Sequence, residues 1–138
     1  MRLNILILDD ERAGVQDLHN ALSAKHDVVW ARSINRALTE VDESTFDIII
    51  CGVHLLNESM FDFLKQVTEK AENKRIPFVC FRAVEPGEFG KSSDRMIENA
   101  SKMVGADKYI AVETNRDDPE ALRRDVESVL LPLLQTRS

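Results

Sequence analysis

Three acidic side chains, Asp9, Asp10 and Glu11, follow one another directly after an apolar run at residues 3–8. That run, L-N-I-L-I-L, is typical of a strand, so the carboxylates are expected at its carboxyl end. Carboxylates there would repel an anionic phosphate, and no glycine-rich phosphate-binding loop follows the run. The chemistry open to this group is therefore the binding of a cation, whether a metal ion or a basic side chain.

A second stretch, residues 46–59, reads F-D-I-I-I-C-G-V-H-L-L-N-E-S and contains a continuous apolar run from Ile48 to Cys51. A run without alternation is typical of a strand buried on both faces, as in the middle of a parallel sheet. Gly52 ends the run, and a polar loop follows it. In open α/β sheets, ligand sites lie at the carboxyl ends of the strands, so this loop and the acidic group are expected to share one edge.

The rest of the chain alternates between strand-like and helix-like segments, which must position these residues. Strands are expected at residues 3–8, 27–31, 48–51, 76–81 and 109–112, and helices at 11–24, 34–41, 61–67, 94–104 and 119–133. Ser33 is expected to cap the second helix, and Asp117 or Asp118 the last. Five alternating strands and helices predict an α/β fold in which right-handed crossovers cover both faces of a parallel sheet.

The whole chain, residues 1–138, is expected to form a single domain, because the sequence contains no linker, repeat or low-complexity tract. The irregular segment from Arg82 to Ser93 is the one candidate for mobility. Met103 lies on the apolar side of the fourth predicted helix and is expected to fill the core. The last helix carries more leucines than one buried stripe needs, Leu131 among them, so some are expected to be exposed.

Composition excludes several classes of protein. The formal net charge of −6 and the pI of about 5.1 lack the basic face that nucleic-acid binding requires. No apolar run approaches the length of a membrane span, and the amino terminus has no signal-peptide cleavage pattern. Cys51 and Cys80 lie in apolar strand-like runs and are expected to be buried free thiols. We therefore expect a cytoplasmic protein that binds neither nucleic acid nor membrane.

The order of four motifs resembles the receiver domain of bacterial two-component response regulators, from Leu3 to about Leu134. These motifs are the first strand with D-D-E behind it, F-D-I-I-I-C-G, I-P-F-V-C-F-R-A and G-A-D-K-Y-I. The resemblance implies a flavodoxin-like (CheY-like) fold, a three-layer, doubly wound, five-stranded parallel sheet in the order 2-1-3-4-5. It also implies a phosphoacceptor aspartate ending the third strand, a Mg²⁺-binding acidic pair after the first, a Ser or Thr ending the fourth and a Lys ending the fifth.

Carried over position by position, the resemblance fails where the receiver chemistry lies. Asp9 and Asp10 stand at the metal-binding acidic positions, but Gly52 stands at the phosphoacceptor position. Arg82 replaces the Ser or Thr, and Val112 replaces the Lys. The chain therefore resembles a degenerate receiver, or pseudo-receiver, in which these five residues form the remnant of the pocket.

Aspartyl phosphorylation requires a carboxylate nucleophile, a divalent cation and a further cation that stabilises developing charge. Gly52 supplies neither nucleophile nor metal ligand, and Val112 supplies no charge. We therefore expect no catalytic residue and no cofactor, and Mg²⁺ binding that is weak or absent because only Asp9 and Asp10 remain as ligands. The Arg82 side chain is long enough to reach these carboxylates, and we expect its guanidinium to pair with them in place of the missing cations.

The expected function is that of a stand-alone signalling module, not an enzyme, which acts in a two-component or phosphorelay-type pathway through phosphorylation-independent protein–protein contact. The resemblance places the contact surface on the fourth helix, fifth strand and fifth helix, residues 94–134, for a protein partner or for self-association. It also makes Tyr109 the counterpart of the aromatic that moves in switching receivers, with an ordinary half-exposed edge aromatic as the alternative. Two other functions stay open: a flavodoxin-like small-ligand binder or small enzyme, and a receiver phosphorylated at an unconventional site.

Overall fold

In the computed structural model, the described part of the chain comprises residues 2–9, 13–52, 63, 66–67, 76–84, 98–99, 102–103, 106–113 and 118–135. Its strands are β1 (Asn4–Leu8), β2 (Asp27–Ala31), β3 (Ile48–Gly52), β4 (Phe78–Val84) and β5 (Lys108–Glu113), and its helices are α1 (Ala13–Ser23), α2 (Ile34–Glu43) and α5 (Pro119–Gln135). The strands form one parallel sheet in the order β2-β1-β3-β4-β5. The predicted α/β fold and its strand order are therefore confirmed.

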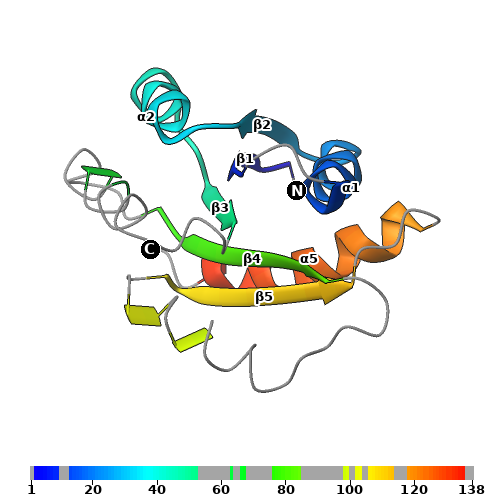
Figure 1. Cartoon of the computed structure of the whole chain (residues 1–138). Coiled ribbons are helices and arrows are strands. Elements are labelled where there is room, and N and C mark those ends of the chain that lie inside the picture. The colour runs from blue at the N-terminus through cyan, green and yellow to red at the C-terminus, as the bar shows by residue number, and fades with distance from the viewer. Residues whose placement is uncertain are drawn as a thin grey trace.

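Helices α1 and α5 cover one face of the sheet, and α2 covers the other (Figure 1). Apolar residues of α1 and α5 pack with alternate residues of the strands in one core cluster, which contains Ile50 and Phe81. The second cluster lies on the α2 face and contains Cys51 and the helical residue Phe63. Every residue of β3 is buried, so the unbroken apolar run at residues 48–51 is explained by the position of this strand between two layers.

Side-chain caps fix the starts of two helices. Ser33 has an extended backbone before α2, and its hydroxyl accepts a hydrogen bond from the Arg36 amide at 3.1 Å. The Asp118 carboxylate accepts a hydrogen bond from the Ala121 amide at 3.0 Å, and Pro119 is the first residue of α5. Each cap satisfies an amide that has no partner inside its helix, and both predicted starts are confirmed.

The fourth strand differs from the prediction. β4 begins at Phe78 instead of residue 76 and continues to Val84, so residues 82–84 belong to the sheet and not to the irregular segment. Their partners in β5 are Ala111, Val112 and Glu113. Pairing with the adjacent strand extends β4 beyond its apolar run, an effect that the sequence of β4 alone does not encode. The rest of the irregular segment, and most of the third and fourth predicted helices, lie outside the described residues.

Two expectations about apolar side chains are wrong. Met103 is 81% exposed and therefore does not fill the core. None of the leucines at the end of α5 is exposed: Leu130 is buried, and Leu131, Leu133 and Leu134 are half-buried and pack against the core cluster of α1 and α5. Periodicity identifies the residues on one side of a helix, but the packing of the helix on the sheet decides how much of each is buried. Among the described helices, none combines the length and the apolarity that a membrane crossing requires.

A buried histidine joins three elements at the amino end of the sheet. His26, 3% exposed, lies in the turn between α1 and β2. Its Nδ1 accepts a hydrogen bond from the Leu3 amide at 3.1 Å, so Nε2 carries the ring proton and donates to Glu127 Oε2 of α5 at 2.7 Å. This network ties β1, the turn and α5 together at the end of the sheet opposite Asp9.

Candidate functional site

The candidate site lies where β1 and β3 end side by side. Asp9 is the residue after β1, and Gly52 is the last residue of β3. Leu8 pairs with Cys51 in the parallel register, so the next residues, Asp9 and Gly52, are neighbours across the two strands. Paired residues of parallel strands direct their side chains to the same face. The structure thus brings Asp9 beside Gly52, the residue at the position that the receiver resemblance assigns to the phosphoacceptor, while Asp10 lies outside the described residues.

Hydrogen bonds to β2 hold the main chain of Asp9 at two points. Its amide donates to the Ala31 carbonyl at 3.1 Å, and its carbonyl accepts from the indole Nε1 of Trp30 at 3.1 Å. Asp9 is only 3% exposed, which is unusual for a residue with a carboxylate side chain. Contacts within the protein, and not solvent, therefore determine where this carboxylate lies.

The Asp9 carboxylate fills the space in which a side chain at position 52 would begin. A Cβ built on Gly52 would have Oδ2, Cγ and Oδ1 of Asp9 as its three nearest atoms, all closer than the 3.0 Å that real Cβ contacts respect. Even the methyl group of alanine would overlap the carboxylate, so only glycine is compatible with this arrangement. The Asp9 carboxylate thus occupies the space in which a side chain at position 52 would begin.

Arg82 and Val112, the two other described pocket residues, lie on the next two strands of the sheet, β4 and β5. Gly52 pairs with Phe81, so Arg82 is the next residue of β4, where it is half-buried. Val112 lies in β5, beside the residue that follows Arg82. The structure therefore brings Asp9, Gly52, Arg82 and Val112 to the carboxyl ends of four neighbouring strands. The pairing of the Arg82 guanidinium with the acidic residues stays a prediction.

Cys51 and Cys80 pair across β3 and β4, so the two cysteines of the chain lie in adjacent strands, next to Gly52. Both are buried thiols and neither belongs to a disulfide, as predicted. Burial raises the pKa of the Cys51 thiol well above its ordinary value, and the nearby Cys80 and Asp9 raise it further. Cys51 is therefore a neutral thiol that packs as a small apolar side chain and does not act as a nucleophile.

Of the acidic pair that the receiver resemblance implies for Mg²⁺, the described residues contain only Asp9. Among them, no three His, Cys, Asp or Glu side chains are grouped so that they could hold a metal ion. Mg²⁺ demands near-octahedral oxygen ligation. Gly52 has no side-chain oxygen, and the Asp9 carboxylate is packed against that glycine. The described part of the site thus lacks the ligand set of a divalent cation.

Trp30, the only tryptophan of the chain, is a site residue that the sequence analysis did not identify. Besides donating to Asp9, its ring lies with its centroid 5.6 Å from that of His19 in α1 and 4.7 Å from the guanidinium carbon of Arg32. The indole is therefore held between α1 and the residue after β2. The sequence signal was a lone tryptophan in a short strand, which ordinary core packing explains equally well.

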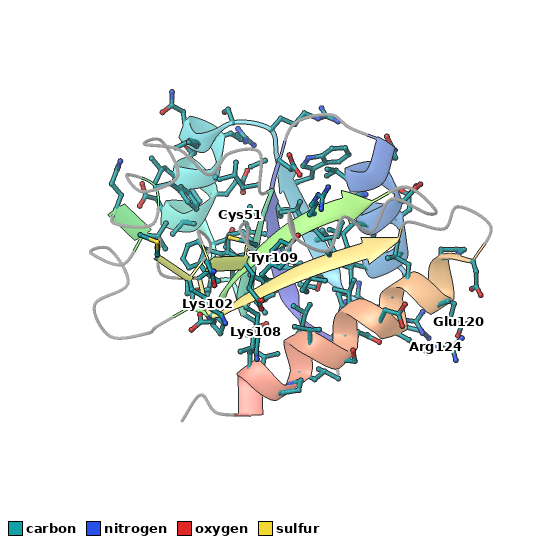
Figure 2. The ribbon with its side chains drawn as sticks, turned by 60° about the horizontal axis from the view of Figure 1, so that its bottom comes forward. Cys51, Lys102, Lys108, Tyr109, Glu120 and Arg124 are labelled. Carbon is teal, nitrogen blue, oxygen red and sulfur yellow. The ribbon has the colours of Figure 1, made fainter. Side chains whose placement is uncertain are left out.

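Tyr109 lies on β5, an edge strand of the described sheet, and is half-buried. Figure 2 shows it near the start of β5 with Lys108, whereas Glu120 and Arg124 mark the beginning of α5, near the carboxyl end of that strand. This half-buried position agrees with the alternative interpretation of Tyr109 as an ordinary edge aromatic. A switching role for Tyr109 stays a prediction.

Comparison with solved structures finds the same fold in several response regulators. The chain matches the chemotaxis response regulator CheY4 of Vibrio cholerae with a TM-score of 0.68 and 24% identity, covering 94% of this chain and 99% of that one. It matches the receiver domain of the TMAO respiratory system response regulator TorR with a TM-score of 0.69 and 19% identity, covering 99% of each chain. For a response regulator from Thermotoga maritima the TM-score is 0.65 and the identity 18%, covering 94% and 98%. No protein-family model matches the sequence, and comparison with curated proteins finds no match. At these identities the likeness shows the fold.

Proposed function

We propose that this chain, whose fold is that of response-regulator receiver domains, is a pseudo-receiver in a two-component or phosphorelay-type pathway. It acts by contact with other proteins and accepts no phosphoryl group at the position that receivers use. The observation that carries the proposal is the contact between Asp9 and Gly52, in which the Asp9 carboxylate takes the space of the missing acceptor side chain. A signal therefore reaches this protein, or leaves it, without an aspartyl phosphate.

The environment of the nearby side chains supports this proposal. A nucleophile must be presented to the phosphodonor, with cations that stabilise the transferred group. Asp9 is 3% exposed and packed against the end of β3. Cys51 is fully buried, and burial holds its pKa high, so the thiol stays neutral. Neither side chain is presented to a phosphodonor, and neither a cofactor nor tight Mg²⁺ binding is part of the proposed mechanism.

The proposed contact surface comprises the fourth predicted helix, β5 and α5, residues 94–134. β5 is an edge strand of the described sheet, and Lys108 on it is exposed. Met103 is 81% exposed and is the one large apolar side chain among the described residues with such exposure. Edge strands are open to pairing, and methionine is enriched in protein interfaces. These features support a protein partner at this surface.

Intact-mass spectrometry after incubation with acetyl phosphate and Mg²⁺ tests the chemistry. We expect no added phosphoryl group, because the acceptor position has no side chain. A receiver that retains its acceptor aspartate, treated in parallel, serves as the positive control. A stoichiometric gain of one phosphoryl group on this chain would overturn the proposal and identify an unconventional acceptor.

Capture of a partner with the native chain and two matched variants tests the contact surface. Met103→Glu introduces a charge on the proposed surface, and Gln16→Glu introduces the same charge at an exposed position of α1. A partner identified by mass spectrometry should bind the native chain and Gln16→Glu equally, and Met103→Glu weakly, with or without a phosphodonor. Binding that depends on the phosphodonor, or that is equal for both variants, contradicts the proposal. A small molecule retained by the purified chain instead would favour the ligand-binding alternative.

A further inference from the structure

We infer that Trp30 and Gly52 form a lock that keeps the Asp9 carboxylate in the space of the missing acceptor side chain. Asp9 follows β1, which lies between β2 and β3 in the sheet. Trp30 acts on Asp9 from β2, and Gly52 makes room for it at the end of β3. The inference rests on the proposed function and deepens it, because the lock keeps this edge of the sheet in one conformation without phosphate. Trp30 is thereby a positioning residue for Asp9.

The first half of the lock is steric. Because Gly52 has no Cβ, the carboxylate can lie over the end of β3, where any larger residue would overlap three of its atoms. The backbone at this point has little freedom to retreat, since all five residues of β3 are buried and the strand is paired on both sides. The close fit of Asp9 on Gly52 is therefore a property of the sheet itself.

The second half of the lock is the hydrogen bond from the indole. β2 ends at Ala31, and the Trp30 N–H supplies the donor for the carbonyl of the residue that follows β1. An indole nitrogen can only donate, so in this contact Trp30 is the donor and the Asp9 carbonyl is the acceptor. The ring is held by His19 at 5.6 Å between centroids and by the Arg32 guanidinium carbon at 4.7 Å. These neighbours fix the donor, and the donor fixes the main chain of Asp9.

Two double-mutant cycles on the intact chain test the lock, with urea unfolding followed by far-UV circular dichroism. The first combines Gly52→Ala with Asp9→Ala. Alone, Gly52→Ala should lower the urea midpoint because the new methyl overlaps the carboxylate, whereas in the Asp9→Ala background it should have little effect. The second combines Gly52→Ala with Trp30→Phe, which keeps an aromatic ring but removes the N–H. Asp9 can then move away from the new methyl group, so the decrease in the urea midpoint caused by Gly52→Ala should fall to about half or less.

Additive effects in both cycles would overturn the lock. If Gly52→Ala alone does not fold, folding itself becomes the readout: the double variant with Asp9→Ala must then fold, and its failure overturns the lock as well. Cys51→Ala is the matched control, because Cys51 precedes Gly52 in β3 and belongs to the core cluster on the α2 face. Its effect should add to that of Trp30→Phe.

A local measurement separates the positioning role of Trp30 from general stabilisation. Hydrogen exchange of the Asp9 amide, which donates to Ala31, should accelerate by roughly fivefold or more in Trp30→Phe, as expected for one lost neutral hydrogen bond nearby. The amide of Leu6, in the middle of β1, should keep its native rate. Equal acceleration at both amides would refute the lock. None of these measurements involves phosphate or a partner, so failure of the lock is distinguished from failure of the proposed function, which the phosphodonor and partner-capture experiments test.

Discussion

Gly52→Asp, which puts an aspartate at the position that the receiver resemblance assigns to the phosphoacceptor, should strongly destabilise this protein. The new Cβ would begin closer than 3.0 Å to three atoms of Asp9. Overpacking of this kind costs about 1–3 kcal/mol. Two carboxylates about 4 Å apart also repel each other by about 4 kcal/mol at an effective dielectric constant near 20. A domain has about 5–15 kcal/mol of unfolding free energy in total, so a loss of about 4 kcal/mol or more at neutral pH should remove a large part of it.

Urea unfolding at two pH values measures this loss and separates its two causes. Repulsion requires both carboxylates to be ionised, so it weakens as the pH falls and one of them takes up a proton. The destabilisation by Gly52→Asp should therefore be smaller near pH 4, roughly where carboxyl groups titrate, than near pH 7. Gly52→Asn, which has the same shape without the charge, should lose stability equally at both pH values. Circular dichroism and the fluorescence of Trp30, the only tryptophan, should give coincident transitions.

One result would refute the reasoning. If Gly52→Asp were as stable as the native chain at neutral pH, the Asp9 carboxylate would not occupy the space above Gly52. A variant that was also phosphorylated by acetyl phosphate would show that a single substitution restores the receiver pocket. The steric argument, and with it the observation that carries the proposed function, would then have to be abandoned.

Three further predictions concern other residues of the site and the fold. Arg82→Thr should destabilise the chain by about 1–2 kcal/mol at neutral pH, much less near pH 3, and should raise the affinity for Mg²⁺, because the guanidinium is expected to neutralise the acidic residues; equal urea midpoints at neutral pH would contradict it. His26→Leu should lower the unfolding free energy by about 2 kcal/mol in thermal unfolding, because the Leu3 amide and the Glu127 carboxylate lose their partner; a change within about 0.5 kcal/mol would mean that the network contributes nothing net. The thiols of Cys51 and Cys80 should not react with a chromogenic disulfide reagent at neutral pH and should both react in urea, because both are buried and burial raises the pKa of Cys51. The stabilisation by the neutral Cys51 thiol is fully present below the ordinary thiol pKa and is lost as the pH rises through the raised one.

Local patterns in the sequence were sufficient for most of the fold. The bounds predicted for β2 match the structure, because the strand signal and the turn residues around it are local. Ser33 and Asp118 were identifiable because a cap depends on residues within one helical turn. Burial of the run at residues 48–51 followed from its lack of alternation. By contrast, the extension of β4 through residues 82–84 depends on pairing with β5, which lies far along the chain.

The features of the candidate site also fall into those that the sequence determined and those that depend on the tertiary structure. The sequence by itself determined that Gly52 follows the apolar run at residues 48–51 and that carboxylates follow the first strand, because the identity of a residue is independent of its surroundings. Only the tertiary structure decided that the Asp9 carboxylate lies on Gly52, that Trp30 holds its main chain, and that Met103 faces outward. Each of these depends on strand register and helix packing between segments distant in sequence. No local pattern encodes the distance between two side chains that meet only when the sheet has formed.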